Sequence, residues 1–147
     1  MVLSAILARV TQQARAKLSV YKSKPFARFA RKARIRDADL WASALLAKRG
    51  LIDADLGGGV IKQRIARPGE GKSGGMRSIV LFRTGSRAVY VYGFEKKERA
   101  NIRQDELEAF RELARVVLGY TESEIAQQVK DGAFIEVRDS EEVLSNG

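Results

Sequence analysis

Hydrophobic and polar residues alternate along the chain with two periods, one typical of helices and the other of strands. Apolar residues recur at intervals of three and four positions in five segments, which predicts five amphipathic helices. Proline, glycine and a Thr-x-x-Glu capping box mark the boundaries of three of them. The expected helices are 2–16, one that starts at Pro25 and carries Phe26 to Ala33, one that follows Asp37 or Asp39 and stops at Gly50, 104–118, and one from Thr121 to Lys130.

Segments of alternating polarity, rich in β-branched and aromatic residues, predict five strands. These strands are 18–23, 60–67, 77–84, 87–94 and 134–137. Residues 53–59 are expected to form a connector, and residues 69–75 a basic, glycine-rich loop. The predicted class is α+β, in which one layer of helices, N-terminal and C-terminal, packs against a small and mostly antiparallel sheet.

A hairpin is the clearest local feature of the sequence. Gly85-Ser86 separates two expected strands and predicts a two-residue type II′ turn. That turn places Phe82 opposite Val89 and makes one face of the hairpin apolar. The other face is mixed, and there we favour core packing for Tyr90 and Phe94. The residues expected on the apolar face are Val80, Phe82, Val89 and Val91.

The residue types that are present exclude several kinds of chemistry. The 147 residues include no cysteine and no histidine, which excludes disulfides, thiol catalysis, serine–histidine triads and the usual zinc sites. The apolar start of the chain lacks a basic region and is interrupted at Arg9. We therefore expect no signal peptide, no membrane span and a cytoplasmic location, and we expect neither a metal nor a cofactor.

Charge is distributed unevenly along the chain. Residues 1–100 contain 22 basic and 7 acidic side chains, whereas residues 101–147 contain 5 basic and 11 acidic ones. A basic body favours a polyanionic partner, most often a nucleic acid; the alternative is a soluble protein with a high isoelectric point. Residues 139–147 are expected to form a loose acidic tail.

The glycine-rich loop contains Gly71-Lys72-Ser73, which matches the end of a phosphate-binding loop. The rest of that motif is missing, because position 66 is alanine rather than glycine and a strand, not a helix, follows. We therefore interpret the loop as a mobile basic segment that can fold over a nucleic-acid backbone.

Basic side chains from several strand ends are expected to converge on one patch. Lys62 and Arg64 are two positions apart on one strand and therefore point from the same face. The charged turn over 95–99 extends the patch. For Arg77, RNA contact and a side chain that reaches solvent fit equally well; for Tyr92, RNA contact and core packing do. Such a patch suits RNA cleavage by the 2′-hydroxyl, because lysine and arginine can stabilise phosphorane charge and assist proton transfer without a metal.

Several segments together resemble the RelE/ParE toxin superfamily, and within it the RelE-like, HigB-type group of bacterial type II toxin–antitoxin systems. We expect a toxin domain over 18–138, a helical extension over 1–17 and the acidic tail after it. The segments that carry the resemblance are Val60-Ile61-Lys62-Gln63-Arg64-Ile65, Gly75-Met76-Arg77-Ser78-Ile79-Val80 and Val91-Tyr92-Gly93-Phe94-Glu95-Lys96-Lys97-Glu98-Arg99, together with 24–32 and 50–59.

The resemblance implies a toxin that binds the ribosomal A site and cleaves mRNA there, and a cognate antitoxin with a helix-turn-helix DNA-binding domain. By position, it assigns catalytic roles to Lys62, Arg64, Arg77 and Lys97. RelE has a tyrosine for proton transfer four residues after the last arginine of this segment, where this chain has an arginine. The patch as a whole is expected to contact RNA through Arg67, Lys72, Arg83, Tyr92, Lys96, Arg99 and Arg103.

Two other functions fit the same residues. A ParE-like toxin of the same superfamily would inhibit DNA gyrase and cleave nothing, but a gyrase inhibitor has no need of lysines around a phosphate. A non-catalytic RNA-binding module would use the basic patch without chemistry. The cluster of cations at the strand ends favours the nuclease.

Overall fold

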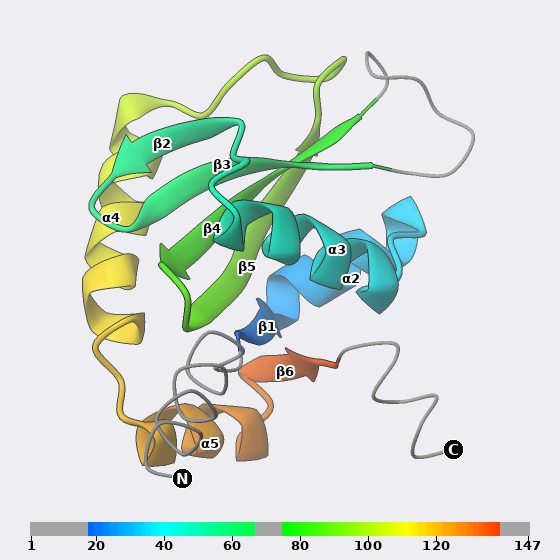
Figure 1. Ribbon diagram of the computed structural model, residues 1–147. Coiled ribbons are helices and arrows are strands. Elements are labelled where there is room, and N and C mark those ends of the chain that lie inside the picture. Colours follow the sequence, from blue (N-terminus) through cyan, green and yellow to red (C-terminus); the bar gives the residue numbers. More distant parts are fainter. Residues whose placement is uncertain (1–17, 67–74, 139–147) are drawn as a thin grey trace, which may run out of the picture.

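The computed structural model describes residues 18–66 and 75–138 and shows a six-stranded sheet with helices on both faces (Figure 1). The strand order is β2-β3-β4-β5-β1-β6; β1 runs parallel to β5, and the other neighbouring pairs are antiparallel. The predicted α+β class is confirmed. The expected helix over 2–16, most of the glycine-rich loop and the acidic tail lie outside the described residues. The elements are β1 (Ser19–Ser23), α2 (Lys24–Ala33), α3 (Asp37–Lys48), β2 (Ala54–Gly57), β3 (Val60–Ile65), β4 (Met76–Arg83), β5 (Arg87–Glu95), α4 (Gln104–Val117), α5 (Glu122–Lys130) and β6 (Phe134–Val137).

Helices cover both faces of the sheet, so the expected single helical layer is wrong. On one face, Phe26 of α2 and Leu40 of α3 belong to the same buried cluster as Val80 of β4. On the other face, Val117 of α4 shares a cluster with Leu81 of β4. The central strands β3, β4 and β5 bury apolar residues on both faces, and a sheet of that kind needs a layer on each side.

The β4–β5 hairpin has a three-residue turn instead of the expected two-residue turn. Arg83 pairs with Arg87, and Ser86 N donates a 3.0 Å hydrogen bond to Arg83 O. Gly85 has a φ of +79°, the left-handed conformation that such a loop uses. Near the turn, each β4 residue therefore pairs with the β5 residue one position before the expected one, so that Phe82 pairs with Ala88 instead of Val89.

This shift and a β-bulge redistribute the hairpin side chains between the two faces. Val80 pairs with Tyr90, but the preceding residue Ile79 pairs with Tyr92, so Val91 is an extra residue in β5. Tyr90 and Tyr92 consequently lie on opposite faces of the sheet. The apolar face expected from the sequence is wrong: Val80 and Phe82 pack toward α2 and α3, whereas Val89 and Val91 pack toward α4.

Tyr90 and Phe94 are core residues, as expected, although they belong to different clusters. The Tyr90 hydroxyl donates a 2.8 Å hydrogen bond to Leu40 O and is also bonded to the Ser43 hydroxyl. Burial raises the pKa of Tyr90 well above its usual value, which leaves this phenol protonated at neutral pH. Phe94 is 3% exposed on the α4 side.

Residues 53–59 contain the strand β2 where we expected only a connector. β2 pairs with β3 in an antiparallel hairpin, and positive φ angles at Gly57, Gly58 and Gly59 form its turn. Arg111 of α4 supports the hairpin by donating a 3.1 Å hydrogen bond from Nε to Leu56 O. A four-residue edge strand next to three glycines carries no alternating pattern, which is why the sequence did not reveal it.

Helix boundaries follow the capping signals that the sequence contains. At the start of α2, Ser23 accepts a backbone hydrogen bond, and at α5 Thr121 and Glu124 form the expected reciprocal capping box. At α3 the expected cap, Asp37 or Asp39, is wrong, because Arg36 takes the N-cap position and both aspartates lie in the first turn. The Asp39 carboxylate accepts a 2.9 Å hydrogen bond from the backbone nitrogen of Arg36. No helix within residues 18–66 and 75–138 is long and apolar enough to span a membrane.

Candidate functional site

Lys62, Arg64 and Arg77 lie on one face of the sheet, the face on which α4 packs. Lys62 and Arg64 follow Val60 at alternate positions of β3, and Val60 is buried in the α4 cluster. Arg64 lies directly opposite Arg77 in the β3–β4 pair. The structure thus gathers three of the four residues expected to be catalytic. Like charges in such positions repel one another, so this cluster needs a compensating anion.

Asp53 supplies a negative charge within this cluster. Its Oδ2 lies 3.3 Å from Arg77 Nε and 3.7 Å from Lys62 Nζ. The backbone nitrogen of Asp53 donates to Lys62 O at 3.1 Å and to the side-chain oxygen of Gln63 at 3.2 Å. The sequence analysis gave Asp53 no role, because it comes just before an edge strand that the pattern did not reveal.

Arg77 is largely buried, and part of its guanidinium has no partner among the described residues. The residue is 9% exposed, and its Nη1 is a buried donor without a hydrogen bond. Leaving such a donor unsatisfied costs about 1–3 kcal/mol. Gly75 allows this arrangement, since an added Cβ would lie 2.7 Å from Arg64 Nε and 3.0 Å from Arg77 Nη1. Gly75 therefore leaves the space that the two guanidinium groups occupy.

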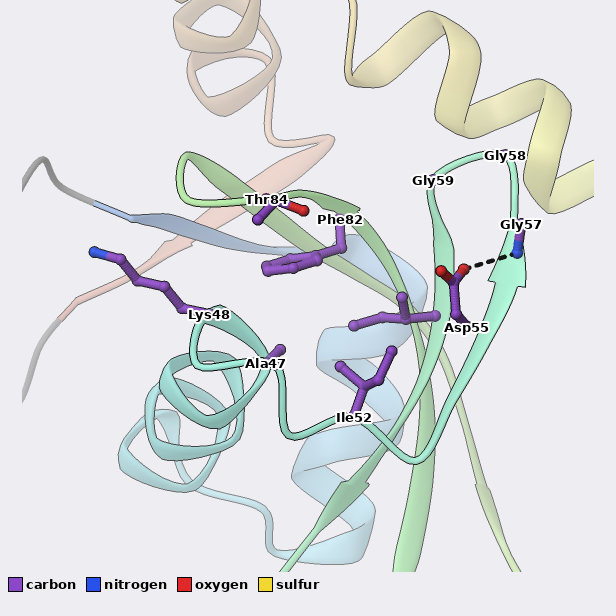
Figure 2. Close-up of a pocket in the computed structure, with 11 residues that line it drawn as sticks. Ala47, Lys48, Ile52, Asp55, Gly57, Gly58, Gly59, Phe82 and Thr84 are labelled. Carbon is purple, nitrogen blue, oxygen red and sulfur yellow. Dashed lines mark hydrogen bonds between the residues drawn. The ribbon is translucent and has the colours of Figure 1, made fainter. Parts of the chain in front are cut away.

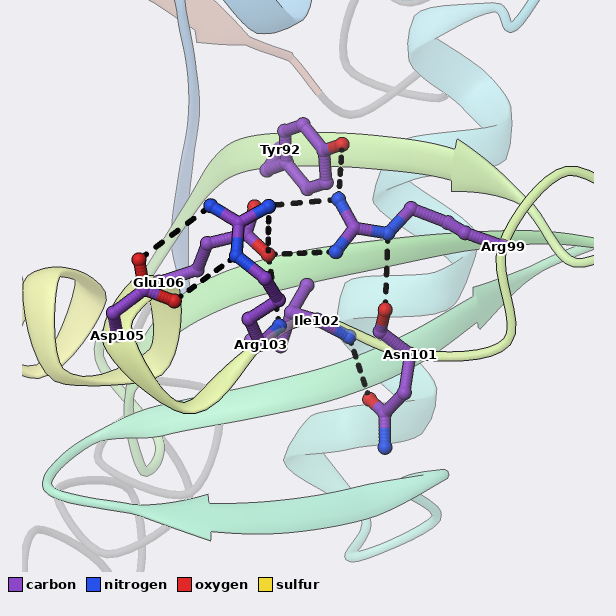
Figure 3. A network of polar contacts seen from close by, with 7 residues as sticks. All are labelled: Tyr92, Arg99, Asn101, Ile102, Arg103, Asp105 and Glu106. Atoms are coloured by element: carbon purple, nitrogen blue, oxygen red, sulfur yellow. Dashed lines mark hydrogen bonds and ion pairs between the residues drawn. The ribbon is translucent and has the colours of Figure 1, made fainter.

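Arg99 stands over aromatic residues of β5 on the same face, and Figure 3 shows its hydrogen bond to the Tyr92 hydroxyl. Its guanidinium carbon lies 5.7 Å from the centre of the Tyr92 ring and 5.8 Å from that of Phe94. Arg99 donates 2.9 Å hydrogen bonds to the Tyr92 hydroxyl and to Asn101 O, and a 2.6 Å bond to Glu106. Phe94 pairs with Arg77, which places this aromatic group beside the cation cluster. The hydrogen bonds that Arg99 donates to Glu106 and to Tyr92 hold the pKa of Arg99 above its usual value.

Arg103 lies at the N-cap of α4, where acidic residues hold it (Figure 3). Its backbone nitrogen donates a 2.8 Å hydrogen bond to Glu106, and its Nε donates a 3.1 Å bond to Asp105. Arg99 and Arg103 therefore both donate hydrogen bonds to acidic side chains in the first turn of α4. This network gives the two arginines a structural role in addition to any RNA contact.

The same network predicts a loss of stability in acid. The hydrogen bond from Arg99, followed by that from the backbone of Arg103, lowers the pKa of Glu106 to about 2. A carboxyl whose pKa is lower in the folded protein stabilises it above the unfolded-state pKa, and that contribution disappears as the pH falls from about 4.5 to about 2.

We therefore expect Glu106→Gln to be less stable than the parent at neutral pH, and the difference to shrink as the pH approaches 2. Thermal unfolding between pH 2 and 7 measures it. The exposed Glu108 on the same helix provides the control, since Glu108→Gln is expected to follow the parent at every pH. A stability difference for Glu106→Gln that stays constant with pH would contradict this account.

Lys96 and Lys97 are exposed in the turn after β5. Lys97 Nζ lies 3.3 Å from the carboxylate of Glu95. Glu95 pairs with Met76, which is buried in the cluster below α2 and α3. The contact of Lys97 with Glu95 therefore lies on the α2 and α3 face of the sheet. Arg77 lies on the other face.

Arg83 lies at the far end of β4, six residues from Arg77, or about 20 Å along the strand. It donates 2.7 Å hydrogen bonds to Leu118 O and to the Ser86 hydroxyl, and so supports the end of α4. The structure therefore separates Arg83 from the cluster of expected site residues. Two further residues expected to contact RNA, Arg67 and Lys72, lie outside the described residues.

A pocket of about 390 Å³ lies elsewhere, between the end of α3 and the β2–β3 turn (Figure 2). Ile52, Phe82 and the three glycines of that turn are among its lining residues, and it includes none of the expected site residues. Within the described part of the chain, no group of three or more acidic side chains is placed to hold a metal ion.

One known protein family matches most of this chain. The model of the RelE toxin of the RelE/RelB toxin–antitoxin system matches residues 18–137. The chain belongs to the RelE toxin family. A comparison with curated proteins gave no match. Membership of the RelE family confirms the resemblance and implies an antitoxin partner, whereas assignment to the HigB-type group stays a prediction. The matched range contains all of Lys62, Arg64, Arg77 and the network around Arg99.

Proposed function

We propose that this RelE-family toxin is a ribosome-dependent mRNA endonuclease that inhibits translation. The observation that carries the proposal is the buried Arg77, whose Nη1 has no partner among the described residues and which lies opposite Arg64, on the sheet face that also carries Lys62. A phosphate fits this arrangement, because it offers several acceptor oxygens and negative charge to a guanidinium fork.

The proposed reaction uses the 2′-hydroxyl of the RNA as nucleophile against the adjacent phosphorus. Lys62, Arg64 and Arg77 stabilise the charge that develops on the phosphorane, and Lys62 provides a proton to the leaving 5′-oxygen. The products are a 2′,3′-cyclic phosphate and a free 5′-hydroxyl. Each role falls on a side chain of the α4 face of the sheet.

The ribosome is proposed as an obligatory partner, because three cations alone orient a flexible RNA poorly. A ribosome that holds the mRNA in place supplies the missing orientation, and pre-orientation can lower a barrier by about 7–11 kcal/mol. The antitoxin that family membership implies is proposed to carry a helix-turn-helix DNA-binding domain, and the toxin is proposed to act in the cytoplasm.

Expression of the toxin alone tests this function against its alternatives. Growth should stop, amino-acid incorporation should fall before DNA supercoiling changes, and co-expression of the antitoxin should restore growth. A change in supercoiling that precedes the loss of translation would support the ParE-like gyrase inhibitor instead. Normal growth with soluble toxin present would support the non-catalytic RNA-binding module.

Gly75→Ala is expected to reduce cleavage while leaving the fold intact. The added methyl group would displace the guanidinium groups of Arg64 and Arg77, and these flexible side-chain ends can move aside at little cost in folding free energy. Displacement of groups that bind the reacting phosphate can cost up to about 10²-fold in rate. Single-turnover cleavage on ribosomes, compared with urea unfolding of the same variant, measures both effects. A parent-like rate would mean that the two guanidinium groups do not act on the substrate together.

A further inference from the structure

Proton transfer is the step for which the site has no assigned base. At position 103 the chain has an arginine, which cannot accept a proton at neutral pH. The Tyr92 hydroxyl already accepts a hydrogen bond from Arg99. Glu106 is a weak base, because Arg99 and the backbone of Arg103 lower its pKa to about 2. Arg99 donates hydrogen bonds to both Tyr92 and Glu106, and Arg103 has no acceptor, so none of these groups is placed to take the proton of a substrate hydroxyl.

Asp53 is a carboxylate that contacts two of the proposed catalytic cations. Its Oδ2 lies within 3.3 Å of Arg77 Nε and 3.7 Å of Lys62 Nζ, so a phosphate bound by these two groups would lie next to it. The Asp53 side chain is 34% exposed, which leaves it open to a substrate. A carboxylate in this place can accept a proton from a group attached to the bound phosphodiester.

The backbone around Asp53 is fixed by a buried polar residue. Gln63 is 3% exposed, and its amide nitrogen donates to Ser43 O at 2.9 Å and to Leu51 O at 3.0 Å. Its side-chain oxygen accepts the hydrogen bond from Asp53 N. These bonds tie the segment before β2 to α3 and to β3, and they hold the Asp53 carboxylate at the edge of the cation cluster.

We propose that Asp53 is the general base of the reaction, an inference that rests on the proposed nuclease function. The Asp53 carboxylate takes the proton of the 2′-hydroxyl as the 2′-oxygen forms its bond to phosphorus. The bond to the 5′-oxygen then breaks, and that oxygen receives a proton from Lys62. Neutralisation of Asp53 removes a like charge beside the phosphorane as its negative charge grows, so proton transfer and charge stabilisation reinforce each other.

Asp53→Asn tests this role, because asparagine keeps the shape and hydrogen-bonding capacity of the side chain but cannot act as the base. Two quantities are measured with saturating ribosomes: the single-turnover rate as a function of pH, and the affinity for ribosomes whose mRNA carries a 2′-deoxynucleotide at the cleavage position. We expect a rate about 10²-fold lower, without the parent's decline in activity at acid pH. Affinity for the deoxy mRNA should be equal or tighter, because a negative charge near the phosphate has been removed.

Two further variants keep this test decisive. Asp55→Asn changes an exposed carboxylate in β2 that caps Gly57 N at 3.0 Å, and it should cleave at the parent rate. Asp53→Glu retains a carboxylate and should recover part of the activity together with the acid decline. If Asp53→Asn does not fold, the same rate and pH measurements are made on Asp53→Glu instead.

Three results would overturn the assignment. Parent-like rate and pH dependence in Asp53→Asn would exclude Asp53 as base. A loss of affinity for deoxy mRNA in proportion to the loss of rate would mean that Asp53 only holds Lys62 and Arg77 in place. If the parent cleaves no mRNA on ribosomes, the nuclease function is wrong and this inference is wrong with it. If only the Asp53 variants differ from the parent in cleavage or affinity, the nuclease function is unaffected and the result bears on Asp53 alone.

Discussion

Arg77→Ala is expected to slow single-turnover cleavage of ribosome-bound mRNA by about 10²–10³-fold. Loss of one preorganised donor to transition-state charge has an effect of this size, about 3–4 kcal/mol. Arg77 is buried, lies opposite Arg64 and has a donor without a partner among the described residues, so that donor is already in place when a phosphate arrives. The rate is measured on saturating ribosomes, with thermal unfolding to confirm that the variant is folded.

Lys62→Ala and Arg64→Ala should also slow cleavage, and their effects should not add to that of Arg77→Ala, since the three groups serve one transition state. Arg31→Ala is the matched control, because this arginine is exposed on α2 and is expected to leave the rate unchanged. If folded Arg77→Ala and Lys62→Ala both cleave at the parent rate, the site is misplaced and activity must come from another surface.

Arg87→Met is expected to lower the free energy of unfolding by about 3 kcal/mol. Arg87 is 1% exposed, and its Nη1 donates to Val117 O at 3.0 Å and to Tyr120 O at 2.9 Å. Hydrogen bonds that involve a charged group contribute about 1.5–3 kcal/mol each, whereas the ion pair with the exposed Glu122 adds little. Methionine fills part of the space but leaves both carbonyl groups without their donor.

Urea unfolding measures this effect, and Arg83→Met provides the comparison. Arg83 also donates to a carbonyl at the end of α4, but it is exposed, so water can replace the lost bond and the destabilisation should stay below about 1 kcal/mol. If both variants lose the same free energy of unfolding, the burial of Arg87 does not explain the strength of its hydrogen bonds. Neither variant is expected to alter cleavage by the folded protein.

Much of the fold could be predicted from the sequence, because several signals in it are local. The capping box at Thr121 and the helical spacing over 104–118 depend on neighbouring residues, and both are confirmed. The register of the hairpin depends on the choice between two and three turn residues around Gly85, a choice that local sequence does not determine. The bulge at Val91 could not be predicted from local sequence either, because it depends on how both faces of the sheet are packed.

The candidate site could be predicted in part. Lys62 and Arg64 share a face because strand geometry requires it, and Arg77 joins them through the pairing of β3 with β4. The contact of Asp53 with Arg77 could not be foreseen, because it depends on β2, a short edge strand without an alternating pattern. Arg87 looks like any other basic residue in the sequence, and its burial follows from the place where α4 ends.

We propose that this RelE-family toxin cleaves mRNA on the ribosome with the cluster around Arg77. The most direct test incubates the purified toxin with defined ribosome–mRNA complexes and with the same mRNA alone, and maps the new RNA ends. We expect cleavage in the ribosome complexes, little cleavage of free mRNA, 2′,3′-cyclic phosphate ends, and loss of all of these in Arg77→Ala. Equal cleavage of both substrates would contradict the requirement for the ribosome, and intact mRNA together with inhibited gyrase would contradict the nuclease itself.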